Sequence, residues 1–218
     1  MKKNTFFTLL GFTLIFTIQS CKEELPPLSI NYGTTSFGSS IYYEGKTGFP
    51  TVDWGTEEGT FLLSGVTQGV NIDASTGEIS WTKTLPLGET KFQVIAHNSH
   101  GQVSVDLAIN NVLGGKFLGA FNTDPNSTVL DLTGLEMNFV FGGTFDTRYN
   151  TFWTTDGVFT LSPDNSTVSG TFTMPGTKDV YSFEGIINYT STQRPTITGY
   201  LKPDTSTTWG GYFQVELQ

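Results

Sequence analysis

The side chains that most often act as nucleophiles or metal ligands are scarce in this chain. It contains one cysteine, Cys21, and two histidines, His97 and His100, among 218 residues. A zinc site needs three or four ligands, and both histidines lie around one predicted hairpin turn. The sequence has no Gly-x-Ser-x-Gly elbow, phosphate-binding loop or dinucleotide-binding glycine motif. We therefore expect no metal, no cofactor and no enzymatic activity. A hydrolase is kept as a remote alternative, because catalytic triads assemble in space from any spacing.

Aromatic side chains are the other group that could bind a ligand. Arg148, Tyr149 and Trp153 fall together in the loop-like stretch FDTRYNTFWTTDG (145–157), and Trp209 lies near the predicted C-terminal hairpin. Exposed aromatic rings stack on sugar faces, and protein interfaces are enriched in Tyr, Trp and Arg. These four residues are the candidate ligand contacts. The alternative is that they belong to the core, as most Trp and Phe residues of a small β domain do.

The first twenty residues indicate where the protein is targeted rather than how it folds. Two lysines are followed by an apolar stretch at 6–18, shorter than the roughly 20 residues of a membrane-spanning helix. The sequence I-Q-S-C at 18–21 resembles the lipobox of bacterial lipoproteins. That resemblance implies a signal peptide at 1–20 and lipid chains on Cys21, so the lipid bilayer is an expected partner. The alternative is a lone cysteine behind an ordinary secretory signal.

Polar residues follow this cysteine directly. Lys22, Glu23 and Glu24 resemble the surface-export signal of Bacteroidota lipoproteins. The resemblance implies an outer-membrane lipoprotein that is exposed on the cell surface, and an arbitrary polar tether is the alternative. Because paired prolines at 26 and 27 favour an extended chain, residues 21–29 are expected to form a short tether.

Composition and charge exclude several classes of protein. Asp and Glu outnumber Lys and Arg by 20 to 11, which gives a formal net charge of −9. Phosphate would be repelled, so no nucleic-acid partner is expected. Aromatic residues make up 14% of the chain, which is too many for a disordered protein. A single cysteine also excludes a disulfide framework.

Apolar and polar residues alternate along the first half, which predicts strands. The segment 69–109 contains the motifs I-D-A-S-T-G-E-I at 72–79, L-P-L-G at 85–88 and A-H-N-S-H-G at 96–101. By these motifs it resembles the bacterial Ig-like, cadherin-like (dystroglycan-type) domain. This resemblance implies a β-sandwich over 28–112 that serves mainly as a spacer or adhesive module. The acidic calcium motifs of true cadherin repeats are not evident, and Asp73 is interpreted as a turn residue. The residues that match the family pattern are Gly69, Ile72, Asp73, Thr76, Gly77, Ile79, Leu85, Pro86, Gly88, Val94, Ala96, Asn98, Ser99 and Gly101.

A second domain is expected over 113–218, where the period-two alternation is more regular. Gly170, Gly185, Gly199 and Gly211 interrupt the apolar face of successive predicted strands. Inward glycines let a strand coil sharply, as small barrels require. We therefore predict an all-β protein whose second domain is an antiparallel barrel of about eight strands, generically lipocalin-like. A second β-sandwich is the alternative.

Turn segments rich in Asp, Asn, Pro and Ser recur at 122–128, 162–167 and 202–207. Convergent turn chemistry explains them, but acidic loops gathered at one barrel end could also hold a hard cation.

An anchor, a spacer and an aromatic-rich β module, in this order, predict a non-enzymatic surface lipoprotein. Its expected role is adhesion, or the binding of a glycan or protein ligand. A lipocalin-like carrier of a small apolar molecule is the alternative, and it requires a hollow barrel.

Overall fold

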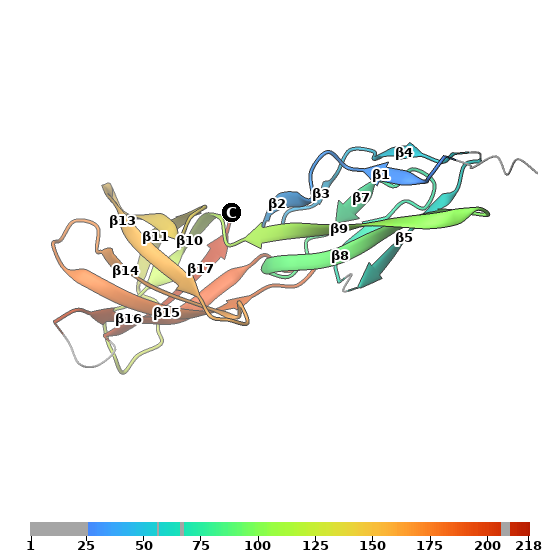
Figure 1. The fold of residues 1–218 in the computed structure, drawn as a ribbon. Helices are drawn as coiled ribbons and strands as arrows, with labels where there is room; N and C mark the ends of the chain where they lie inside the picture. Colours follow the sequence, from blue (N-terminus) through green and yellow to red (C-terminus); the bar gives the residue numbers. More distant parts are fainter. Residues whose placement is uncertain (1–25, 56, 66–67, 206–209) are drawn as a thin grey trace, which may run out of the picture.

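The computed structural model describes residues 26–55, 57–65, 68–205 and 210–218 (Figure 1). All the helices and strands assigned in these ranges are β-strands, with no helix among them, so the described chain is all-β, as predicted. Accordingly, this part of the chain holds no helix long and apolar enough to cross a membrane. Cys21, Lys22, Glu23, Glu24 and Trp209, all singled out by the sequence, lie outside the described residues.

The first domain is a sandwich. Its main sheet has the order β2-β9-β8-β5, with β2 parallel to β9, and a second sheet has the order β3-β7-β6. Alternate apolar side chains of these sheets form one core that includes Phe61, Ile79, Phe92 and Ile109. A separate pair, β1 and β4, lies at the tether end (Figure 1). The strands are β1 (Ser29–Asn31), β2 (Ser36–Ser40), β3 (Gly45–Lys46), β4 (Thr51–Asp53), β5 (Thr60–Gly65), β6 (Val70–Ile72), β7 (Ile79–Trp81), β8 (Gly88–Asn98) and β9 (Gly101–Val112).

The β6–β7 turn shows how local sequence determines the backbone here. A carboxylate oxygen of Asp73 accepts hydrogen bonds from the backbone N–H groups of Ser75 and Thr76 at 2.8 and 3.0 Å. The hydroxyl of Ser75 also donates to it, and these bonds hold the pKa of Asp73 below its usual value. Gly77 then adopts a φ of 72°, which costs glycine little. Asp73 is therefore a turn residue, as predicted.

The second domain is a closed barrel of eight antiparallel strands, so the alternative of a second sandwich is wrong. Neighbouring strands are joined in chain order, and β10 pairs with β17 from Phe117↔Leu217 to Phe121↔Phe213 to close the ring. The strands are β10 (Gly115–Phe121), β11 (Leu132–Val140), β12 (Thr144–Tyr149), β13 (Phe152–Leu161), β14 (Thr167–Thr173), β15 (Val180–Asn188), β16 (Thr196–Pro203) and β17 (Gly211–Leu217).

Aromatic rings fill the barrel interior. Phe145 is completely buried, and its ring centroid lies 5.1–5.8 Å from those of Phe139, Phe172 and Phe183. Strands approach one another closely at an inward glycine of this barrel. A Cβ atom on Gly170 would lie 2.0 Å from the carbonyl oxygen of Val158, so no larger residue fits there.

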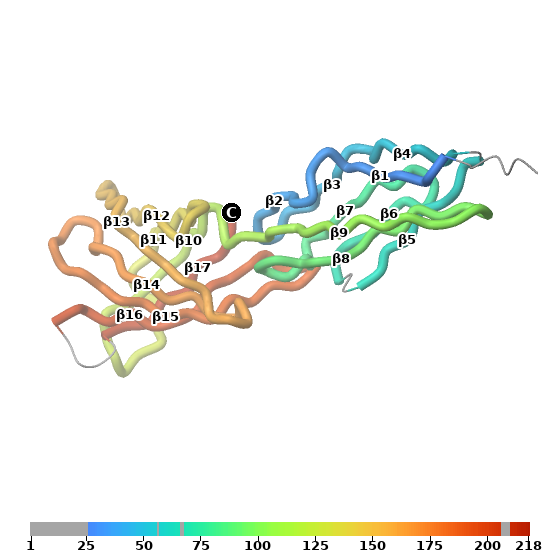
Figure 2. The backbone as a smooth tube through the Cα atoms, viewed as in Figure 1, coloured from blue at the N-terminus to red at the C-terminus, as the bar shows by residue number. Residues whose placement is uncertain are grey.

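The sandwich closes one end of this barrel. Ile41 and Leu87 of the sandwich, and Leu113 in the connection between β9 and β10, are buried in the same cluster as the barrel phenylalanines. Across the junction, the side-chain amide of Asn165 donates to the carbonyl of Leu87 at 3.0 Å. The hydroxyl of Tyr189 donates to the carbonyl of Leu85 at 3.2 Å. The domains therefore lie end to end, with the β1–β4 pair and the barrel toward opposite ends of an elongated molecule (Figure 2).

We name the barrel end that faces the sandwich proximal and the other end distal. Because the strands form an up-and-down meander, successive loops alternate between these ends. The loop at 162–167 is proximal, through Asn165, whereas the loops that begin at 122 and at 204 are distal. The three acidic turn segments therefore do not gather at one end, and no group of three metal-ligating side chains occurs among the described residues.

Because the aromatic interior is packed, a substitution that leaves a cavity there should lower the free energy of unfolding strongly. Phe145→Ala is expected to lower the free energy of unfolding by about 3–5 kcal/mol, because the ring's contacts are lost. Phe141→Ala is the matched control, since that ring is 79% exposed, and it should cost less than about 0.5 kcal/mol. Urea unfolding of the full-length protein measures both values. Equal effects of the two substitutions would contradict this account of the core.

Candidate functional site

The stretch 145–157, which has a loop-like composition, is in fact a hairpin. It contains all of β12 but its first residue, a tight turn at 150–151, and the first six residues of β13. Asn150 adopts a φ of 56°, which asparagine tolerates better than most residues. The strand pattern is obscured because a bulge shifts the register between Phe145 and Thr147 and because Trp153 faces outward. The prediction of a loop is therefore wrong.

This hairpin places two of the candidate residues against each other. Arg148 lies opposite Trp153 in the β12–β13 register, on the outer face of the barrel. Its guanidinium carbon is 5.2 Å from the centre of the indole ring, which is within the range of a cation–π contact. The Nε atom of Arg148 also donates to the carbonyl of Asn150 at 3.0 Å, which fixes the arginine. Trp153 is still 52% exposed, so part of its ring is open to a ligand.

A buried carboxylate supports the arginine from the other side. Glu136 lies opposite Arg148 on β11 and is only 5% exposed, although it faces outward. Its Oε2 atom is 2.9 Å from Nζ of Lys116 and 3.9 Å from a guanidinium nitrogen of Arg148. Two cations thus compensate a carboxylate that would be costly to bury alone. Leu118, opposite Glu136 on β10, is exposed beside it.

We name these five residues, Trp153, Arg148, Glu136, Lys116 and Leu118, the Trp153 platform. The platform crosses four neighbouring strands, from Arg148 and Trp153 near the distal end of the barrel to Lys116 at the start of β10, close to the sandwich. Sequence reasoning missed Glu136, Lys116 and Leu118. Their only local signal was outward parity, and their meeting depends on a register that pairs residues far apart in the chain.

The remaining candidates are placed differently. Tyr149 is half-buried against the barrel core, with its ring centroid 5.1 Å from that of Phe121. It therefore faces away from Arg148 and Trp153. Phe152 is exposed at the distal rim, close enough to Gly176 that a Cβ atom there would lie 3.0 Å from its ring. Of the four predicted contacts, the structure brings together Arg148 and Trp153.

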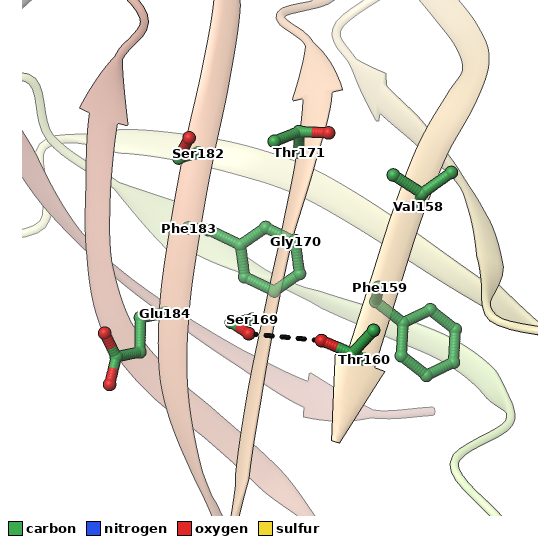
Figure 3. A pocket seen from close by; sticks show the side chains of 9 residues that line it. All are labelled: Val158, Phe159, Thr160, Ser169, Gly170, Thr171, Ser182, Phe183 and Glu184. Carbon is green, nitrogen blue, oxygen red and sulfur yellow. Dashed lines mark hydrogen bonds between the residues drawn. The ribbon is translucent and has the colours of Figure 1, made fainter. Parts of the chain in front are cut away.

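A shallow hollow of about 400 Å³ lies on the outer wall, further along β13. Figure 3 shows two rows of side chains across β13, β14 and β15, with Phe159, Gly170 and Phe183 between them. The hydroxyls of Thr160 and Ser169 are 3.4 Å apart within it. Gly170, which has no side chain, lies at the centre of the hollow, and four of the surrounding side chains carry hydroxyls. The rows are Val158, Thr171 and Ser182, and Thr160, Ser169 and Glu184.

Asp156 lies on β13 between the platform and this hollow. The hydroxyl and the backbone N–H of Thr173 on β14 both donate to its carboxylate. These hydrogen bonds, that of the hydroxyl above all, lower the pKa of Asp156. The pair ties β13 to β14 next to the bulge.

The histidines lie at the opposite end of the molecule. Nε2 of His97 is 2.9 Å from the hydroxyl oxygen of Thr60, and Nε2 of His100 is 3.9 Å from the carboxylate of Glu57. Both histidines flank the β8–β9 turn at the tether end of the sandwich. They are therefore remote from the Trp153 platform.

Comparisons with known proteins identify no family. No family model matches this chain, and no curated protein sequence matches it. Two crystal structures of human protocadherin-24 EC1-2 align with 11% and 12% identity at TM-scores of 0.41 and 0.40. The alignments cover 88% and 81% of this chain and 96% and 93% of those chains. A quinonprotein alcohol dehydrogenase-like protein from Bacteroides thetaiotaomicron has 15% identity and a TM-score of 0.28, covering 81% of this chain and 38% of that one. These scores lie below 0.5, which is too low to establish a shared fold.

The lowered pKa of Asp156 predicts a pH-dependent contribution to stability. The hydrogen bonds from Thr173 favour the ionised carboxylate, so they stabilise the fold above the ordinary carboxyl pKa and are lost as the pH falls through the lowered value. Asp156→Asn should therefore be less stable than the wild type near pH 7, and the difference should shrink toward pH 2, well below the usual carboxyl range of about 4. Thermal unfolding across this pH range measures the difference. A difference independent of pH would contradict the assignment.

Proposed function

We propose that this protein is a non-enzymatic, lipid-anchored surface module that binds a ligand through the distal part of its barrel. The observation that carries the proposal is the exposed Trp153 ring, stacked on an Arg148 side chain that is itself fixed. An aromatic ring that is half exposed to solvent and fixed in orientation is typical of a binding surface rather than of a core.

The arrangement of the domains supports a presenting role. Pro26, the first described residue, lies beside Gly55 near the β1–β4 pair, at the end of the sandwich away from the barrel. With lipid on Cys21, the tether would place the sandwich nearest the membrane and the distal end of the barrel, where Trp153 follows the β12–β13 turn, farthest from it (Figure 1). The sandwich then acts as a spacer.

A protein partner fits the Trp153 platform best. The platform is spread over an outward-facing barrel wall, and it combines Trp, Arg and Leu side chains with a paired charge. Trp and Arg are the side chains that most often dominate binding energy at protein interfaces. Arg148 is already oriented by Glu136 and Asn150, so little conformational entropy remains to be lost on binding.

A glycan is the second candidate, and the hydroxyl-lined hollow in Figure 3 favours it. A polysaccharide could stack on Trp153 and continue along β13 toward Thr160 and Ser169. The carrier alternative has less support, because aromatic rings occupy the interior that an apolar ligand would need.

Substitution of the stacked pair tests the binding surface. The full-length protein, purified in detergent, is applied to arrays of extracellular proteins and of oligosaccharides. Trp153→Ala and Arg148→Ala should each lower the affinity for the captured ligand roughly 30-fold or more, as expected for central interface residues. Arg148→Lys should also weaken it, since an ammonium group lacks the planar face that stacks on indole.

Tyr200→Ala is the matched control, because Tyr200 is an exposed aromatic residue on another part of the same barrel. This variant should bind as the wild type does. Failure of both arrays to capture any ligand, or capture that is insensitive to Trp153→Ala, would refute this binding surface.

The lipid anchor is tested separately. Cys21→Ser should move the protein from the detergent phase to the aqueous phase on phase separation, because acyl chains supply the membrane affinity. In whole cells carrying the unaltered protein, added proteinase should degrade it. A Cys21→Ser variant that stays in the detergent phase would refute the anchor, and full protection in intact cells would refute surface exposure.

A further inference from the structure

A second concave site lies at the junction of the two domains, on the side of the Ile41–Tyr43 turn. The groove has a volume of about 450 Å³ and is formed mainly by the sandwich, with Phe141 contributed by the barrel. Ligand sites occur preferentially at such domain boundaries. The lining residues used below are Ser39, Ser40, Tyr43, Glu44, Trp81 and Phe141.

Two aromatic rings in this groove are left open to water. Phe141 is 79% exposed and Tyr43 is 60% exposed. Phe141 begins the β11–β12 turn, where Gly142 and Gly143 have φ values of 105° and 83°. Single exposed apolar residues need no explanation, but two large exposed rings in one groove are typical of a binding surface.

The backbone that presents Tyr43 is strained. Tyr42 has a φ of 65°, in a turn closed by a hydrogen bond from the N–H of Tyr43 to the carbonyl of Ser40 at 3.1 Å. Positive φ is normally reserved for Gly or Asn, and strained residues cluster at functional sites. Ile41 and Tyr42 pack against the barrel core, and Lys83 lies 4.9 Å above the Tyr42 ring. Packing thus holds the turn in the conformation that leaves Tyr43 exposed.

The polar groups of the groove define the ligand's chemistry. The indole N–H of Trp81 already donates to the hydroxyl of Ser39 at 2.9 Å. What remains is rich in acceptors, namely the Glu44 carboxylate and the serine hydroxyl oxygens. Among the described residues that line the groove, Glu44 carries the only charge, so an anionic ligand would be repelled. A wholly apolar ligand would leave these polar groups without hydrogen bonds.

We propose that this groove binds a neutral pyranoside of a glycan. The rings of Tyr43 and Phe141 stack on the C–H faces of the sugar, and Glu44 with the serines accepts hydrogen bonds from its hydroxyls. A proline-rich peptide fits less well, because the indole N–H of Trp81, which could donate to a peptide carbonyl, is already engaged by Ser39. The site is independent of the Trp153 platform.

The test uses the full-length protein in detergent on an array of neutral, sialylated and uronic-acid oligosaccharides together with proline-rich peptides. Neutral oligosaccharides should be retained, and calorimetric titration then gives their affinity. Tyr43→Ala and Phe141→Ala should each weaken binding roughly tenfold or more, as loss of a stacked ring does. Unchanged thermal unfolding midpoints would show that both variants are folded.

Two variants serve as controls. Phe49→Ala removes another exposed ring of the sandwich outside the groove, and it should leave the affinity unchanged. Trp153→Ala should also leave it unchanged, whereas a sugar lost only in Trp153→Ala would support the platform and overturn this groove. Retention of acidic glycans alone, of proline-rich peptides alone, or of no neutral oligosaccharide would likewise overturn the proposal.

Discussion

The rest of the architecture depends on the hydrophobic contact between the two domains. Ile41, Leu87 and Leu113 are buried in the same cluster as the barrel phenylalanines, so the sandwich and the barrel share one core. A hinge at this point would expose these side chains to water, at a cost of about 25 cal/mol for each Å² of apolar surface. The hydrogen bonds of Asn165 and Tyr189 to sandwich carbonyls add direction to this contact. Relative motion is the default for linked domains, but a shared core opposes it and keeps the walls of the junction groove together.

Much of the fold was predictable because β-sheets encode their two faces locally. From β14 to β17, the residues that alternate in the sequence are the ones that alternate between core and solvent, Phe172 and Phe183 facing inward and Thr171 and Glu184 outward. The inward glycines, Gly170 among them, correctly indicated a barrel. Asp73 and Gly77 marked their turn because both act on the backbone within a few residues.

What could not be predicted depends on residues that are distant in sequence. The β12–β13 hairpin was taken for a loop because a bulge and an outward tryptophan broke the alternation. Glu136 is buried only because Lys116 and Arg148 reach it from neighbouring strands. Ile41 gave no sign that it enters another domain, and nothing local placed Tyr43 and Phe141 in one groove. Such features require the register of the sheets and the docking of the domains.

The pairing of β10 with β17 has a consequence for the order in which the chain acquires its structure. Phe117 and Leu217 are partners across this seam, although a hundred residues separate them. During synthesis or export from the N-terminus, the sandwich strands are available long before Gly211–Leu217 emerges. Until then β10 and β16 are open edges, which readily pair with other chains. The last strand, β17, therefore closes the barrel by pairing with both open edges. A chain that ended before β17 would be prone to aggregate through β10 and β16.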